Sequence, residues 1–270
     1  MKRQLGILLS AVSLVIGMTA GAAAANYSDE MKMTEPSKIT KQEGAASAER
    51  QFDHRGTPYF AHPDIFHMKS NSTRTILTGF HTLQQSSEWS CGPAAALMAL
   101  QWYGRAGTYT EEKLAAFRHP LQDVHVEGFP DGYPGTTLNQ MEDIFNRVGG
   151  FTYEDSNTYK KKNETLTPQR IQEELKQGHP ILVAWIDWGG HWQVIIGYDT
   201  MGTESTLDDV LIVADSYDVT DHNQDGYGIY PAARFFSVFN MYGQFPEREG
   251  GNQQLFLIPK PISSKTHPSR

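Results

Sequence analysis

Cys91 is the only cysteine among the 270 residues of the chain. It lies in the stretch EWSCGPAAALMALQWYG, where Pro93 suits the first turn of a helix and Gly104 suits the left-handed position after its end. We therefore expect a buried helix that begins at Cys91 and ends at Tyr103. The unpaired N–H groups and the macrodipole at the start of a helix favour a thiolate, the nucleophilic form of cysteine. Taken alone, Cys91 also fits a small, inert hydrophobic side chain.

A thiol nucleophile needs a base, and His191 is the best placed of the ten histidines. It follows the pair Gly189-Gly190, which suits a turn between two predicted strands, and it opens the run HWQVIIGYD. His191 is therefore expected at the mouth of a central strand. The other histidines lie mainly in polar segments or near the ends of the chain. By itself, His191 also fits a structural histidine at the end of a strand.

Asp215 is the candidate for the group that orients the imidazole. It follows the apolar run VLIVA, where an unpaired carboxylate would be costly. If residues 200–209 close an antiparallel hairpin symmetrically, His191 and Asp215 lie on the same face, diagonally adjacent. A register slip of one residue would place them on opposite faces. Asp199 and Asp218 therefore remain alternatives.

Gln85 is the candidate for a hydrogen-bond donor to the oxyanion that forms during acyl transfer. The backbone N–H of Cys91 supplies one donor, and a side-chain amide on the segment before the nucleophile would supply the second. Gln85 lies six residues before Cys91, whereas Gln84 points the other way if the chain is extended. A glutamine in QQSS means little without the other three residues.

The four candidates occur in an order that resembles a known family of peptidases. The matching features are Gln85-x5-Cys91-Gly92, a helix ending at Tyr103-Gly104, Gly190-His191-Trp192 and Ala214-Asp215. They are similar to the peptidase family C-thirty-nine type, papain-like cysteine peptidases that trim bacteriocin leader peptides, over about residues 75–218. The resemblance implies a papain-like α+β fold and four roles: nucleophile for Cys91, general base and acid for His191, orienting group for Asp215 and oxyanion donor for Gln85.

Two departures from that family concern the substrate rather than the chemistry. Ser90 stands where aspartate is common in the leader-processing enzymes. Those enzymes are usually domains of transporters and act in the cytoplasm, whereas this sequence begins with the pattern of an export signal. The resemblance therefore supports the catalytic chemistry and does not carry over a leader-peptide substrate.

Residues 1–25 have the three-part form of a secretory signal peptide. Lys2 and Arg3 precede the apolar stretch LGILLSAVSLVIGM, and the small residues AGAAAA place a cleavage site after Ala25. An uncleaved membrane anchor is the alternative, because the apolar run is nearly long enough to span a bilayer. We expect a secreted, periplasmic or cell-envelope protein with no membrane span after removal of the signal.

The charge balance argues against a nucleic-acid partner. The chain has 23 basic and 31 acidic residues, a net charge of −8. Removing residues 1–25, which hold two basic residues and no acidic one, leaves 21 against 31, a net charge of −10. Binding to phosphate backbones requires clustered Lys and Arg instead. Exported proteins that use cysteine structurally carry it in pairs, so a solitary cysteine indicates a free, intermolecular or chemically active thiol.

The remaining chain divides into two predicted parts. Residues 26–55 are polar and lack sustained periodicity, which predicts a flexible linker or a removable pro-segment. Residues 56–270 are expected to form one papain-like peptidase domain. The stretch RTILTGFHTLQQ predicts a strand that enters the site.

The predicted helices precede most of the predicted strands. Their N-terminal signals are the capping boxes Thr108-Glu111 and Thr137-Gln140, and the cap Thr167 followed by Pro168. The runs ILVAW, HWQVIIGYD, VLIVA and QQLFLIPKP are β-branched or aromatic, and PAARFFSVFN predicts a short helix between the last two. Helices followed by a mainly antiparallel sheet predict an α+β fold.

Four residues that flank the catalytic candidates are expected to bind substrate: Trp89, Gly92, Gly190 and Trp192. Gly92 would let substrate approach the backbone closely. Trp89 and Trp188 would form an aromatic wall, although most tryptophans of the chain also fit the core. The Gly- and Pro-rich segment VEGFPDGYPGTT is expected to overhang the cleft.

A separate motif, DHNQDG, matches the first half of a calcium loop. Asp221, Asn223 and Asp225 occupy positions one, three and five. Ala232 stands at position twelve in place of the bidentate glutamate, so a polar turn is the alternative. No other cofactor is expected.

The residues taken together predict an exported cysteine peptidase that hydrolyses peptide or isopeptide bonds through a thioester. Two other uses of the same site remain open: a transpeptidase, in which an amine resolves the thioester, and a peptide-binding module without turnover. Calcium-dependent structural adhesion through residues 221–226 is a third alternative.

Overall fold

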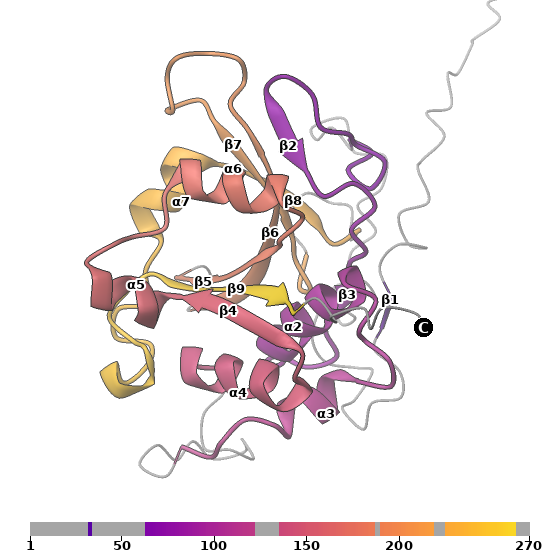
Figure 1. Ribbon diagram of the computed structural model, residues 1–270, viewed down its shortest axis with the longest axis vertical. Coiled ribbons are helices and arrows are strands. Elements are labelled where there is room, and N and C mark those ends of the chain that lie inside the picture. Colours follow the sequence, from indigo (N-terminus) through magenta and orange to yellow (C-terminus); the bar gives the residue numbers. More distant parts are fainter. Residues whose placement is uncertain (1–31, 34–62, 122–134, 187–189, 219–224, 263–270) are drawn as a thin grey trace, which may run out of the picture.

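The computed structural model describes residues 32–33, 63–121, 135–186, 190–218 and 225–262 (Figure 1). The larger of two sheets in these ranges has seven strands in the order β4-β9-β5-β6-β7-β8, with β2 also paired to β6, and all of its pairings are antiparallel. Its strands are β2 (Arg74–Ile76), β4 (Phe151–Asp155), β5 (Ile181–Trp185), β6 (His191–Asp199), β7 (Val210–Ala214), β8 (Tyr227–Pro231) and β9 (Leu255–Pro261).

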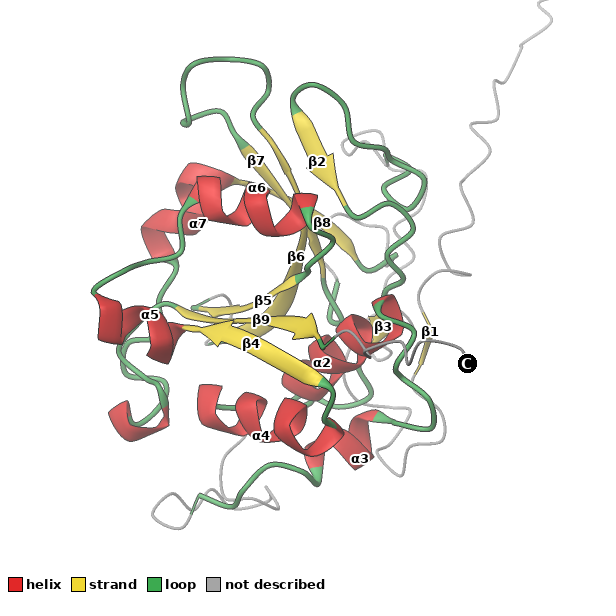
Figure 2. Cartoon of the chain, viewed as in Figure 1, coloured by secondary structure: helices red, strands yellow, loops and turns green. Residues whose placement is uncertain are grey.

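Helices cover both faces of this sheet (Figure 2). They are α2 (Cys91–Trp102), α3 (Glu111–Ala115), α4 (Leu138–Val148), α5 (Ser156–Lys162), α6 (Pro168–Lys176) and α7 (Ala232–Val238), with a 3-10 turn, η2 (Glu247–Glu249). In the view of Figure 1, α2, α3 and α4 lie below the sheet, and α6 and α7 lie above it. The mixed helices and antiparallel sheet confirm the expected α+β class.

β6 is central, as the sequence predicted, because it pairs with β5 and β2 along one side and with β7 along the other. All five residues of β5 are buried, and eight of the nine in β6, since helices pack against both faces. The side chains of α2, α4, α6 and the sheet join one hydrophobic core. In the described ranges no helix combines the length and apolar character that a membrane crossing requires.

Several helix signals act as predicted. Thr137 and Gln140 form a reciprocal capping box at the start of α4, and Gly149 follows that helix with a φ of 72°. Thr167 caps α6. The expected capping box at Thr108 is wrong: α3 is capped by Thr110, whose side chain accepts from the N–H of Lys113.

The predicted strand over residues 74–85 is interrupted. It forms β2 and then a separate two-residue strand, β3 (Leu83–Gln84), after a turn at Gly79 with a φ of 76°. β3 pairs in parallel with β1 (Lys32–Met33), which lies inside the predicted linker 26–55. The rest of that linker and the predicted signal peptide 1–25 lie outside the described residues.

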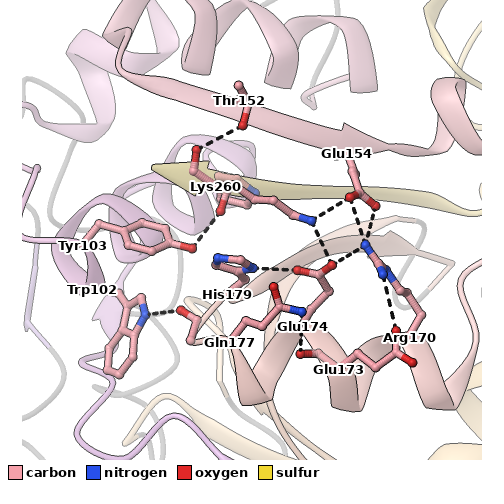
Figure 3. Close-up of polar contacts among 12 residues, drawn as sticks. Trp102, Tyr103, Thr152, Glu154, Arg170, Glu173, Glu174, Gln177, His179 and Lys260 are labelled. Atoms are coloured by element: carbon pink, nitrogen blue, oxygen red, sulfur yellow. Dashed lines mark hydrogen bonds and ion pairs between the residues drawn. The ribbon is translucent and has the colours of Figure 1, made fainter. Parts of the chain in front are cut away.

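A cluster of charged side chains joins α6 to β4 and β9 (Figure 3). Glu174 is 0% exposed, and its carboxylate contacts Arg170 at 2.5 Å, Lys260 at 2.9 Å and His179 at 2.6 Å. Glu154 on β4 contacts both Arg170 (2.9 Å) and Lys260 (2.6 Å). Two acids and two bases therefore neutralise one another between a helix and two strands.

Loss of the buried acid should destabilise the protein. Glu174→Gln removes the buried carboxylate and leaves Glu154 as the one that Arg170 and Lys260 share, so we expect the free energy of unfolding to fall by about 3 kcal/mol. Glu173→Gln, one residue earlier and 58% exposed, is the matched control and should change it by less than about 0.5 kcal/mol. Urea denaturation measures both. Equal effects of the two substitutions would contradict a structural role for the cluster.

Candidate active site

Cys91 is the first residue of α2, as the sequence predicted. Ser90 precedes it as the N-cap residue, and its carbonyl accepts the N–H of Ala94 at 2.9 Å. The helix ends at Trp102, and Gly104 takes a φ of 65° beyond it. The thiol of Cys91 is free and 6% exposed. The apolar run after it packs against the sheet, so the helix holds the sulfur at a fixed point beside β6.

A β-bulge places Asp215 on the same face as His191. At the far end of the β6–β7 hairpin, Asp199 pairs with Val210, so residues 200–209 close the hairpin symmetrically. That register alone would put Asp215 opposite Val194, on the other face from His191, so the expectation that symmetric closure places both on one face is wrong. The register shifts by one residue between Ile195 and Gly197, after which Val194 pairs with Ala214. Asp215 then follows opposite Gln193, which shares a face with His191.

The two side chains meet within this sheet. His191 Nε2 lies 2.6 Å from Asp215 Oδ1. Because that nitrogen faces the carboxylate, Nδ1 is left for the contact that the ring makes with the Cys91 thiol. The imidazole therefore stands between a carboxylate and the sulfur.

Electrostatics favour a charged pair. Burial by itself would lower the pKa of His191, but the charge and hydrogen bond of Asp215 and the contact with Cys91 hold it well above its usual value. Burial would likewise raise the pKa of Asp215, yet His191, the Tyr217 N–H and the Gln193 amide bring it below its usual range. The geometry thus supports an imidazolium beside an ionised carboxylate.

The alternatives to Asp215 have other partners. Asp199 lies at the far end of β6, where its carboxylate is 3.7 Å from Arg74. Asp218 accepts a hydrogen bond from the N–H of Gly226. The carboxylate that contacts His191 at 2.6 Å is that of Asp215.

Gln85 is fixed close to the Asp215 segment. Its backbone N–H donates to the carbonyl of Ser216 (2.9 Å), and its side-chain oxygen accepts from the Ser216 hydroxyl (2.7 Å). Its Nε2 donates to the carbonyl of Ser87 at 2.7 Å. An amide nitrogen carries two hydrogens, so this bond uses only one of them.

Glu111 supports the same segment from α3. Its carboxylate is 0% exposed and accepts from both the N–H (3.2 Å) and the hydroxyl (3.0 Å) of Ser86. This buried bond explains why Glu111 does not form the capping box predicted with Thr108. The prediction of a capping box was wrong because a glutamate near the start of a helix suits a local cap as well as a buried contact of this kind.

Thr136 forms a wall beside the start of α2. A Cβ on Gly92 would overlap the Thr136 side chain, so glycine is required for this close approach. The Trp192 indole N–H donates to the Thr136 carbonyl (2.7 Å), and Arg118 donates to the Thr136 hydroxyl (3.0 Å). Arg118 also lies over the ring of Trp89, 5.1 Å from its centre.

The four expected substrate-binding residues have different surroundings. Trp89 is half-buried near the nucleophile. Trp192 is 1% exposed and Gly92 is buried, so both support the Thr136 wall and do not offer a surface to substrate. Gly190, with a φ of 114°, lies against Met241. Gly189, Trp188 and most of the overhanging segment 126–137 lie outside the described residues.

Comparison with protein families identifies the family of the chain. Residues 77–246 match the Peptidase_C39 like family, a span that includes all four catalytic candidates. The chain belongs to this family. Membership points to cysteine peptidase activity on a peptide substrate, and the helix-and-antiparallel-sheet arrangement is consistent with the papain-like fold expected of it. No curated protein matches the chain.

The described residues cover only the end of the calcium motif. Asp221 and Asn223 lie outside the described residues. Asp225 is 3% exposed, and its carboxylate accepts from the N–H of Tyr227 at 2.9 Å. Within the described ranges no group of three or more His, Cys, Asp or Glu side chains is arranged to hold a metal ion.

The sequence did not lead us to expect a role in the site for three residues: Gln193, Glu111 and Thr136. Gln193 could have been found, because it lies two residues after His191 on a strand and therefore on the same face. Thr136 lies at the end of a segment predicted to overhang the cleft, but nothing in the sequence pairs it with Gly92.

The contact between Gly92 and Thr136 can be tested by complementary substitutions. Gly92→Ala should lower the free energy of unfolding by about 2 kcal/mol, since the added methyl group overlaps the threonine. Thr136→Gly in the same chain should relieve this overlap, whereas Thr136→Ala keeps the Cβ and should not. Thermal melting of the single and double variants measures the effect. Equal melting of Gly92→Ala with and without Thr136→Gly would contradict the contact.

The buried pair should also make stability depend on pH. Asp215→Asn should lower the unfolding free energy by about 3 kcal/mol between pH ~4 and ~6.5, where the unfolded chain has both groups charged. The raised pKa of His191 gives stability that is complete below pH ~6.5 and is lost as the pH rises through the folded value. The lowered pKa of Asp215 gives stability that is lost as the pH falls through its folded value.

Asp209→Asn is the control for this measurement. Asp209 is 3% exposed, but its partner is the uncharged hydroxyl of Tyr198 at 2.5 Å. The loss of unfolding free energy caused by Asp209→Asn, measured by urea denaturation, should not change between pH ~6 and ~9. If the loss of unfolding free energy caused by Asp215→Asn is equally constant over this pH range, that result would contradict a protonated His191 ring.

Proposed function

We propose that this protein is an exported cysteine peptidase that hydrolyses peptide or isopeptide bonds through a thioester. The observation that carries the proposal is the position of His191, whose ring contacts the Asp215 carboxylate at 2.6 Å and the Cys91 thiol. Family membership supports the cysteine peptidase class. The pattern of residues 1–25 supports export.

The first half of the reaction forms the thioester. The Cys91 thiolate attacks the carbonyl carbon, a C–S bond forms, and an electron pair moves onto the carbonyl oxygen. The backbone N–H of Cys91 and the second amide hydrogen of Gln85 donate to this oxyanion. The oxyanion then re-forms the carbonyl while His191 gives its Nδ1 proton to the substrate nitrogen, so the C–N bond breaks, the amine leaves and the thioester remains.

The second half restores the enzyme. Neutral His191 takes a proton from water, and the water oxygen attacks the thioester carbonyl. The C–S bond then breaks, the acid product leaves, and the thiolate and imidazolium form again. Asp215 keeps its hydrogen bond to Nε2 in both halves and stabilises the ring when it is charged.

The resting site suits this cycle because its charges are already separated. Asp215 is 4% exposed and the His191 side chain is 14% exposed, so little solvent must reorganise when the proton moves. Water as acceptor gives hydrolysis, and an amine would give transpeptidation from the same thioester. The two reactions therefore share the four residues and differ only in what enters after the first product leaves.

The thiol should react as a thiolate in mildly acidic solution. We expect iodoacetamide to alkylate Cys91 with a half-maximal rate below pH ~8.5, the value for an ordinary thiol. His191→Ala should remove this reactivity at low pH, and Cys91→Ala should abolish both alkylation and cleavage of a peptide library. His179→Ala is the matched control, because His179 also contacts a buried carboxylate at 2.6 Å but lies in the α6 cluster.

Each outcome has a distinct meaning. Cleavage by the Cys91→Ala variant would overturn the proposal. An ordinary alkylation profile with no cleavage would favour the peptide-binding module. Mass spectrometry of the intact protein with the library would detect an acyl adduct on Cys91, and transfer of that acyl group to added amines would indicate the transpeptidase.

A further inference from the structure

We infer that Gln193 is a positioning residue of the site, which holds Asp215 in place and so sets the pH range in which the thiolate and imidazolium coexist. The inference rests on the proposed function, since it concerns the same thiol chemistry. Gln193 is 1% exposed, and its Nε2 donates to Asp215 Oδ2 at 2.6 Å. The hydrogen bonds of its side chain join it to Trp185, Asp215 and Tyr230, so it acts on the site through the carboxylate.

The orientation of the Gln193 amide follows from its neighbour on β5. The Trp185 indole N–H lies 2.7 Å from the Gln193 side-chain oxygen. An indole nitrogen can only donate a hydrogen bond, so the atom that it faces must be the amide oxygen. The NH2 group must then face Asp215. Trp185 thereby makes Gln193 an obligatory donor to the carboxylate.

The hydrogen bonds form a row across adjacent strands. Hydrogen bonds link Trp185 on β5 to Gln193 on β6, and Gln193 to Asp215 after β7. The Tyr230 hydroxyl on β8 lies 3.3 Å from Gln193 Nε2. The Trp185 ring packs edge-on against Tyr230, with ring centres 5.4 Å apart. This ring packing therefore helps to hold the row of hydrogen-bonded side chains in place between β5 and β8.

The two carboxylate oxygens of Asp215 have separate partners. Oδ1 accepts from the Tyr217 N–H at 2.8 Å and faces His191, and Oδ2 accepts from Gln193. A carboxylate held at both oxygens cannot rotate away from the imidazole. Without the Gln193 bond, Oδ2 would be buried with one donor fewer, and rotation of the group would weaken the contact with His191.

The other titratable groups near this pair come from different elements. Cys91 faces His191 from the start of α2. Tyr230 of β8 contacts the amide and is one step from the carboxylate. A shift in the alkylation profile of a Gln193 variant is read as a change in the contacts among Cys91, His191 and Asp215.

Two substitutions separate donation from packing. Gln193→Met keeps the approximate volume and cannot donate at any pH. Gln193→Glu can imitate the amide while protonated, since a carboxylic acid accepts from Trp185 and donates to Asp215. Two adjacent carboxylates resist ionising together, so the added acid keeps its proton at low pH and loses it as the pH rises.

The experiment is the rate of iodoacetamide alkylation of Cys91 against pH in the full chain. The acidic limb of this profile is the pH range in which the alkylation rate rises from its low-pH value. For Gln193→Met we expect this limb to move to higher pH by about one unit, so that the alkylation rate at a given pH on the limb is about tenfold lower than in the wild type. Gln193→Glu should follow the wild type at low pH and depart from it at high pH. Gln140→Met is the matched control, because Gln140 is a buried glutamine with bonds to Thr137 and His119.

Gln140→Met should lower the melting temperature without moving the limb. An unmoved limb in Gln193→Met, or an equal shift in Gln140→Met, would overturn the role of Gln193 and leave the proposed function intact. An ordinary thiol profile in the wild type would overturn the proposed function itself. The two failures are therefore distinguishable in one set of measurements.

Discussion

The buried contact between His191 and Asp215 is the interaction on which the rest of the site depends. Two charges removed from water are costly unless each finds close partners. His191 has the carboxylate at 2.6 Å and the thiol of Cys91, while Asp215 has backbone and amide donors from Tyr217 and Gln193. These partners come from three segments, since β6 carries Gln193, the residues after β7 include Asp215 and Tyr217, and α2 carries Cys91. The fold must hold all three segments at once.

A single extra residue in β6 decides whether the pair can form. The loop after Asp199 sets a register that would turn Asp215 to the opposite face, and the bulge at Ile196 corrects it by one residue. The carbonyl of Ile196 accepts the N–H of Leu77 at 2.8 Å, so β2 stabilises the bulge from the other side. Bulges near active sites commonly re-aim a side chain in this way. Here the irregular strand brings the carboxylate to the imidazole.

The sequence predicted those parts of the structure that depend on local chemistry. The start of α2 at Cys91, the Thr137 capping box and the central position of β6 follow from proline, cap residues and β-branched runs. The pairing of His191 with Asp215 was conditional on a register that no local signal fixes. The bulge that sets it, and bonds between distant segments such as Glu111 with Ser86, depend on tertiary contacts. β4, α5 and β8 were missed because their sequences lack strong periodicity.

The most direct test of the account is the protonation state of His191 in the resting protein. Isotope-labelled nitrogen NMR near neutral pH, with Cys91 unmodified, distinguishes an imidazolium from a neutral ring. We predict that both ring nitrogens carry protons, because the Asp215 carboxylate and the sulfur of Cys91 face them and the pKa of His191 is held well above its usual value. A neutral ring with one protonated nitrogen would contradict the account, since the sulfur would then lack the charge that the proposed chemistry requires.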